Sequence, residues 1–165
     1  MHDAPIRILV TGGTFDKDYL ELEGRLHFRD THVPEMLKLG RSRLPITVET
    51  LMLIDSLEMT DEHRARVLEA CRRAGEERLV ITHGTDTMAA TARTVGAAGL
   101  AKTIVLTGAM VPYTFGSSDG LFNLGSALAF AQSLPHGTYV AMNGRALRWD
   151  DVHKDKRTGV FESET

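Results

Sequence analysis

The sequence is poor in cysteine and lacks long hydrophobic runs. Its single cysteine, Cys71, cannot form an intramolecular disulfide, which favours a reducing, cytoplasmic location. No apolar stretch approaches the roughly 20 residues that span a bilayer, and the first ten residues lack the basic and apolar regions of a secretory signal. We therefore expect no membrane as a partner.

The sequence also lacks an excess of positive charge. Its formal net charge of -3 argues against nonspecific binding to nucleic acid, so small molecules are the expected partners. A chain of 165 residues suits one domain, and no linker or internal repeat divides residues 1–165.

Nucleotide and metal motifs are missing as well. The segment "TGGT" (11–14) has neither the G-x-G-x-x-G spacing of a dinucleotide site nor that of a P-loop. The 7 histidines are scattered, without a zinc-binding pattern. We therefore expect no metal and no organic cofactor.

Short β-rich runs alternate with helical segments along the chain. Because most of the runs are apolar throughout, they predict buried parallel strands, and so a single doubly wound α/β sheet with helices on both faces. The strands are expected at 6–10, 46–54, 78–82, 103–107 and 138–142, and the helices at 33–40, 60–75, 85–99 and 117–134, with Thr60 as an N-cap.

Polar clusters follow several of these strands, at the sheet edge where ligands of α/β proteins gather. "TGGT" follows the first strand, "THGTDTM" (82–88) follows the third, and Gly-, Ser-, Thr- and Asp-rich loops lie at 53–60 and 107–119. A threonine beside flexible glycines can attack a carbonyl if a base and oxyanion donors are close. The clusters therefore indicate hydroxyl chemistry.

The blocks "TGGTFDK", "THGTDTM", "DSLEM" and "TGAMVP" resemble the signature blocks of the bacterial-type L-asparaginases. The similarity spans nearly the whole chain, in the same order. It implies an amidohydrolase that converts L-asparagine to L-aspartate and ammonia, with glutamine as a poorer substrate. The family's usual second domain is expected to be absent, and a homodimer or higher homo-oligomer is expected in its place.

The resemblance also assigns catalytic roles. Thr14 matches the nucleophilic threonine of the first motif, and Thr85 and Asp86 match the threonine and aspartate of the second. Lys154, in "DDVHK", matches a lysine that completes a relay with those two residues. Tyr19 is the nearest match to a loop tyrosine that contacts the nucleophile.

Substrate-binding roles follow from the same resemblance. Ser56 matches a serine that holds the α-carboxylate, and Asp86 is expected to pair with the α-ammonium. The backbone carbonyl of Ala109 is expected to face the leaving amide, and Gly13 and Gly84 to line the site. Leu57 stands where some members of the family have a glutamine.

Other interpretations stay open from the residues alone. Thr14 and Asp86 could be ordinary caps, Lys154 could belong to a solvated charged run, and His83 favours a structural role. An amino-acid-binding domain without turnover is the alternative function. An ammonia-supplying component of a tRNA-dependent amidotransferase ranks last, because no basic RNA-binding surface is evident.

Overall fold

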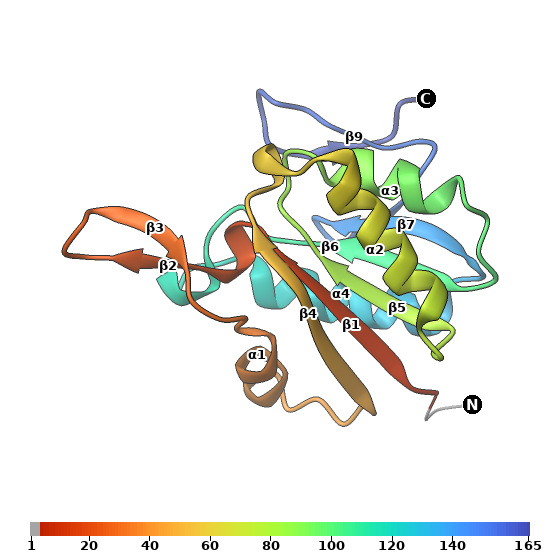
Figure 1. Ribbon diagram of the computed structural model, residues 1–165, viewed down its shortest axis with the longest axis horizontal. Coiled ribbons are helices and arrows are strands. Elements are labelled where there is room, and N and C mark those ends of the chain that lie inside the picture. Colours follow the sequence, from red (N-terminus) through yellow and green to blue (C-terminus); the bar gives the residue numbers. More distant parts are fainter. Residues whose placement is uncertain (1–3) are drawn as a thin grey trace.

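The centre of the molecule is a twisted sheet of six strands (Figure 1). The computed structural model describes residues 4–165. Neighbouring strands pair in parallel, except that β8 is antiparallel to β7 at one edge. The strand order is β4 (Ile46–Ile54), β1 (Ile6–Gly12), β5 (Arg78–Thr82), β6 (Thr103–Thr107), β7 (Gly137–Met142) and β8 (Arg145–Arg148).

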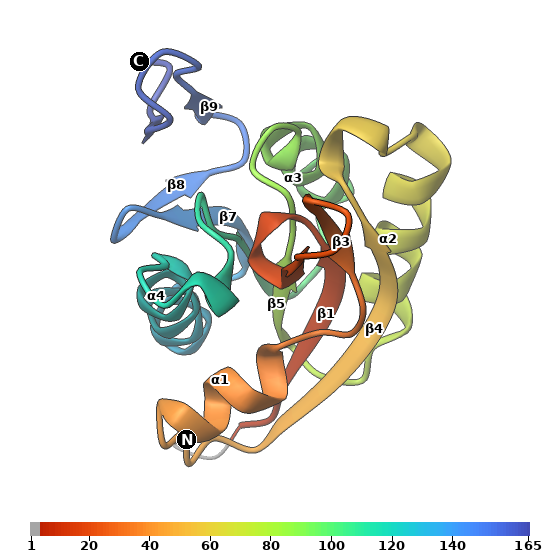
Figure 2. The ribbon, with the colours of Figure 1, turned by 90° about the vertical axis from the view of Figure 1, so that its left-hand side faces the viewer.

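Within residues 4–165, four α-helices cover the two faces of this sheet. Figure 2 shows α1 and α4 on one side of the strands and α2 and α3 on the other. The helices are α1 (Val33–Leu39), α2 (Asp61–Arg73), α3 (Met88–Gly96) and α4 (Gly120–Ser133). The predicted α/β class with helices on both faces is therefore confirmed, and each predicted strand and helix has a counterpart.

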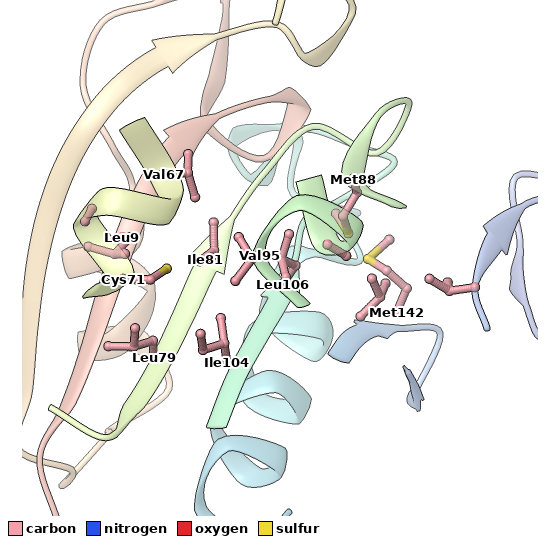
Figure 3. Packing of buried hydrophobic residues seen from close by; sticks show 14 of the residues in the cluster. Leu9, Val67, Cys71, Leu79, Ile81, Met88, Val95, Ile104, Leu106 and Met142 are labelled. Carbon is pink, nitrogen blue, oxygen red and sulfur yellow. The ribbon is translucent and has the colours of Figure 1, made fainter. Parts of the chain in front are cut away.

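Alternate residues of the central strands enter two separate cores. Leu9, Ile81 and Leu106 pack beneath α2 and α3, as Figure 3 shows, whereas Ile8 and Val80 pack beneath α1 and α4. All five side chains are 0% exposed. Burial on both faces explains why these strands are apolar throughout.

Helix α2 begins as its sequence predicts. Thr60 is the N-cap, and it forms a reciprocal capping box with His63. Cys71, on the same helix, is buried in the core, and this burial raises the pKa of its thiol to about 12. The cysteine is therefore an unreactive packing residue.

Two small antiparallel pairs lie outside the main sheet, and the sequence patterns did not predict them. Strands β2 (Lys17–Leu20) and β3 (Arg25–Phe28) form a hairpin that projects from the body (Figure 1). Strands β9 (His153–Lys154) and β10 (Phe161–Glu162) form the second pair near the C-terminus. Such short strands carry too few alternating residues for a periodic signal.

The topological switch point of the sheet lies between β1 and β5, where the chain changes the side of β1 on which it adds the next strand. The chain moves outward from β1 to β4 on one side and then through β5, β6 and β7 on the other. Ligands of doubly wound sheets bind at this switch point, beyond the carboxyl ends of the strands. The hydroxyl of Thr11 joins the two strands there by donating to the carbonyl of Thr82 at 2.7 Å.

None of the helices within residues 4–165 combines the length and the apolar character needed to cross a membrane.

Candidate active site

Three strand-end loops meet at the switch point, and two glycines permit their close approach. A Cβ on Gly13 would lie 2.4 Å from the Cα of Gly84, and a Cβ on Gly84 would lie 2.6 Å from the side-chain oxygen of Ser56. Gly13 also has a φ of 75°, which side-chain-bearing residues rarely adopt. The loops after β1, β5 and β4 therefore pack closely together, as the sequence-predicted site requires.

Thr14 follows this contact directly. It is the first residue of a short 3₁₀ helix, Thr14–Asp16. The cap position is occupied by Gly13, so the interpretation of Thr14 as an N-cap does not hold. The first motif thus turns sharply out of β1 and places a threonine next to the loop of the second motif.

Ser56 is presented by a second 3₁₀ turn, Ser56–Glu58. Asp55 caps this turn by accepting a hydrogen bond from the backbone N–H of Leu57 at 3.0 Å. The hydroxyl of Thr87 donates to the carbonyl of Ser56 at 2.8 Å. These bonds fix the β4 loop against the β5 loop, and Ser56 is 1% exposed.

Lys154 meets the second threonine motif. Its Nζ donates to Thr85 Oγ1 at 2.8 Å and to Asp86 Oδ1 at 2.9 Å. The Lys154 side chain is 14% exposed and that of Asp86 is 48% exposed, so the pair lies at the rim of the site. The Thr-Lys-Asp arrangement expected from the resemblance is present, although the lysine is 68 or more positions away from its two partners.

The C-terminal segment carries Lys154 to this place because it is anchored on both sides of β9. Val152 and Phe161 are fully buried in the core beneath α3. Arg93 of α3 donates to the carbonyl of Val152 at 3.0 Å, and the indole of Trp149 packs against the backbone of α3 at Gly96. The anchored segment leaves the lysine little freedom to move away from Thr85.

Helix α3 begins three residues later than the start of its predicted range at residue 85. Its N-cap is Thr87, and no side chain makes a capping hydrogen bond there. The carboxylate of Asp86 is bound to Lys154 instead. The alternative interpretation of Asp86 as a helix cap is therefore not what the structure contains.

The loop that carries Ala109 is held by one carboxylate. Asp119 accepts hydrogen bonds from the backbone N–H groups of Met110 and Val111, each at 3.0 Å. Asn123 donates to the carbonyl of Gly108 at 2.9 Å and to Asp119 at 3.0 Å. Sequence reasoning missed Asp119 and Asn123, whose only signal is their position just beyond the "TGAM" block.

His83 has a structural role, as its sequence context favours. It is 0% exposed, and its Nδ1 lies 2.7 Å from the carbonyl of Gly84, which can only accept. Nδ1 is therefore the protonated nitrogen, and Nε2 accepts from the hydroxyl of Thr91 at 2.7 Å. Burial lowers the pKa of His83 to about 4, so the ring is neutral at pH 7.

Tyr19 is a predicted site residue that the structure does not bring into this cluster. It lies on β2, its ring is edge-on to Phe115 with centroids 6.5 Å apart, and it is 53% exposed. Its hydroxyl lies close to Gly24 at the hairpin turn, 3.9 Å from where a Cβ on that glycine would be. The role of Tyr19 at the nucleophile therefore stays a prediction.

The base of the β2–β3 hairpin is closed by a buried carboxylate. Asp16 accepts from the backbone N–H of His32 at 2.8 Å and from the hydroxyl of Thr31 at 3.1 Å. Burial raises the pKa of Asp16, and these two hydrogen bonds oppose that rise. The hydrogen bonds of Asp16 to Thr31 and His32 fix the segment that begins at Thr14.

A cleft of about 700 Å³ opens beside Thr85, Asp86 and Lys154. Its other walls come from the loops after β4 and β6, from α3 and from the β9–β10 turn. Within residues 4–165, no three histidine, cysteine or acidic side chains are grouped so that they could hold a metal ion. The polar groups at the cleft are of the kind that bind and activate a small polar molecule.

The sequence matches the family model described as "Asparaginase, N-terminal" over residues 5–164. It is 34% identical to a probable periplasmic L-asparaginase of Haemophilus influenzae, over 94% of this chain and 47% of that protein. It is also 36% identical to one component of the Glutamyl-tRNA(Gln) amidotransferase of Methanococcus vannielii, over 94% of this chain and 37% of that protein.

The fold matches as well. The thermostable L-asparaginase of Thermococcus kodakarensis superposes with a TM-score of 0.86 at 29% identity, over 96% of this chain and 51% of that one. The chain thus spans about half the length of the asparaginases that it matches. The match over nearly all of the described residues shows that this chain belongs to the asparaginase family and corresponds to its N-terminal domain.

Proposed function

We propose that this chain hydrolyses the side-chain amide of L-asparagine to give L-aspartate and ammonia, with Thr14 as nucleophile. The observation that carries the proposal is the contact of Lys154 Nζ with both Thr85 Oγ1 and Asp86 Oδ1, beside the loop that bears Thr14. A weak hydroxyl nucleophile needs such a neighbouring proton-transfer group, oriented by a third residue.

In the first step the Thr14 hydroxyl attacks the amide carbon. The C–N bond breaks, ammonia leaves with the hydroxyl proton, and an ester on Thr14 remains. Water then cleaves the ester and restores the hydroxyl. Because Thr85 Oγ1 already accepts from Lys154, its own hydrogen is available to orient the amide or the water.

The substrate's charges find partners in the same cluster. Ser56, held by Thr87 beside the N-terminus of α3, is proposed to bind the α-carboxylate, where backbone N–H groups favour an anion. Asp86 is proposed to bind the α-nitrogen, and the Ala109 carbonyl to face the leaving amide. Glutamine is expected to react more slowly, because one extra methylene displaces its carbonyl from Thr14.

The test is ammonia release from L-asparagine and L-glutamine by purified wild type and by Thr14→Ala and Thr85→Ala. Thr94→Ala is the matched control, because the hydroxyl of Thr94 bonds only the carbonyl of Ala90 within its own helix. Loss of turnover in both site variants, with native circular dichroism and an active control, is expected. Binding of asparagine by a wild type that releases no ammonia would favour a binding domain instead.

Location and assembly are also proposals. The cytoplasmic location follows from the single, buried Cys71, whereas the Haemophilus relative is named periplasmic. A homodimer is proposed because large apolar side chains outside the cleft, such as Leu39 and Phe122, are 60% and 63% exposed. Sedimentation showing only monomer at micromolar concentration would refute the dimer.

A further inference from the structure

The walls of the cleft beside Asp86 carry mostly positive charge, although the whole chain has a formal net charge of -3. Four of its lining residues are lysines or arginines: Arg93, Lys154, Lys156 and Arg157. Among the described residues that line it, Asp86 is the only acid. A cleft lined by charges of one sign raises the local concentration of ligands that carry the opposite charge.

Two of these cations are already paired and two are not. Lys154 is bound to Asp86 at 2.9 Å, and Arg93 is bound to Glu164 at 2.7 Å. Lys156 and Arg157 are exposed, and neither forms an ion pair with any of residues 4–165. The cleft therefore presents to a ligand two cations that have no ion-pair partner among residues 4–165.

The turn that carries these two cations has a defined conformation. Asp155 accepts from the backbone N–H of Arg157 at 2.8 Å, and the N–H of Gly159 donates to the carbonyl of Asp155 at 2.7 Å. Gly159 has a φ of 72° and lies close to the methyl group of Met110 on the opposite wall. The cations thus project from an ordered β9–β10 turn.

This environment favours an uncharged α-nitrogen over a free α-ammonium group, for which Asp86 is the one acidic partner among the described residues that line the cleft. If Asp86 receives the substrate's α-nitrogen, as the proposed function requires, that nitrogen lies at the entrance to the cleft. The carboxylate of Asp86 is already shared with Lys154, and the nearby walls include Leu57 and Met110, which are 72% and 44% exposed. An ammonium there would face repulsion from Lys156 and Arg157 and apolar surface elsewhere.

We propose that the cleft binds an anionic acyl group attached to the α-nitrogen of the substrate, with Lys156 and Arg157 as its cationic partners. An acylated nitrogen carries no charge but keeps one N–H that can donate to Asp86. The volume of about 700 Å³ is far larger than a single amino acid needs and falls among ligand sites of about 300–1,000 Å³. This inference rests on the proposed function, with L-asparagine as the smallest member of the substrate class.

Two kinds of ligand carry an anionic acyl group on the α-nitrogen of asparagine: a free N-acyl asparagine and an acidic peptide that ends in asparagine. The first experiment is titration calorimetry with the product analogues N-succinyl-L-aspartate and N-acetyl-L-aspartate, which differ by one carboxylate at the end of the acyl group. Wild type is expected to bind the succinyl compound on the order of tenfold more tightly, since each exposed ion pair contributes a factor of a few.

The variants locate the effect. K156Q/R157Q is expected to reduce the preference to less than about twofold, whereas R145Q, at an exposed arginine of β8 outside the cleft, should retain it. The second experiment measures ammonia release from L-asparagine, N-succinyl-L-asparagine and N-acetyl-Asp-Asn. A higher kcat/KM for either derivative identifies the source that the cleft prefers.

Equal affinities for the two analogues, or a preference that persists in K156Q/R157Q, would overturn the anionic subsite. Turnover of L-asparagine together with that result leaves the proposed function intact. A second combination is a preference for the succinyl compound that K156Q/R157Q abolishes, with no ammonia released from any of the compounds. This combination would support the anionic subsite and refute the proposed hydrolase activity. The two proposals therefore fail in different ways.

Discussion

Replacing Gly84 by alanine tests whether the close approach of the strand-end loops creates the site. The backbone of Gly84 does not require a positive φ, so the effect comes from contact alone. The added Cβ would lie 2.6 Å from both Cβ and Oγ of Ser56, whereas ordinary contacts begin at 3.4 Å. One of the two loops must therefore move by about 0.8 Å.

The magnitude follows from this displacement. Overpacking a close contact typically costs about 1–3 kcal/mol of unfolding free energy. A shift on the order of 1 Å in a group that positions substrate can cost about a hundredfold in rate. We expect G84A to fold, to lose about 1–3 kcal/mol of stability, and to lose about a hundredfold in kcat/KM for L-asparagine.

The assay combines urea denaturation with ammonia release. G125A is the matched control, because a Cβ on Gly125 of α4 would meet nothing within 4 Å and should stabilise the helix by about 0.5–1 kcal/mol. The double variant G84A/S56G should recover stability but not activity, because the crowded side chain and the Ser56 hydroxyl are both removed. Wild-type stability and activity in G84A would refute the reasoning.

Three further predictions concern groups around the site. K154M should lower kcat by about 10²–10⁴-fold while changing stability by less than about 1 kcal/mol, because the pair with Asp86 is partly exposed. Unfolding free energy should fall by about 3 kcal/mol as pH drops from about 6.5 to about 4, because His83 is neutral in the fold but protonates when unfolded. D119A should raise KM or lower kcat by freeing the Met110 and Val111 N–H groups, with helix α4 retained by circular dichroism.

Each of these has a result that contradicts it. Full activity in K154M would remove the lysine from the reaction. The pKa of His83 is lower in the folded state than in the unfolded state, so its contribution to stability is complete above the unfolded pKa and is lost as the pH falls. The pH prediction is checked by denaturation at several pH values together with NMR titration of the His83 ring. A His83 ring that titrates near 6.5 would refute it. Unchanged kinetics in D119A would show that the Ala109 loop needs no such support.

The sequence by itself determined the α/β class, the places of the main strands and the capped helix α2. Apolar runs identify buried strands because both faces of this sheet are covered, and Thr60 marks a helix start through its own hydrogen bonds. These are local signals. The same locality explains why the strand-end motifs around Thr14 and Thr85 could be found from the chain alone.

Only the tertiary structure decided which distant groups meet. Lys154 lies in a charged run whose local pattern indicates a solvated face, so its place beside Thr85 was expected only from the family resemblance. It reaches Thr85 because Val152 and Phe161 are buried beneath α3. Asp119 supports the Ala109 loop across a turn, and Tyr19 belongs to a hairpin too short to give a periodic signal. Such contacts depend on how the whole chain packs, because the hydrophobic burial that fixes them is contributed by residues far away in the sequence.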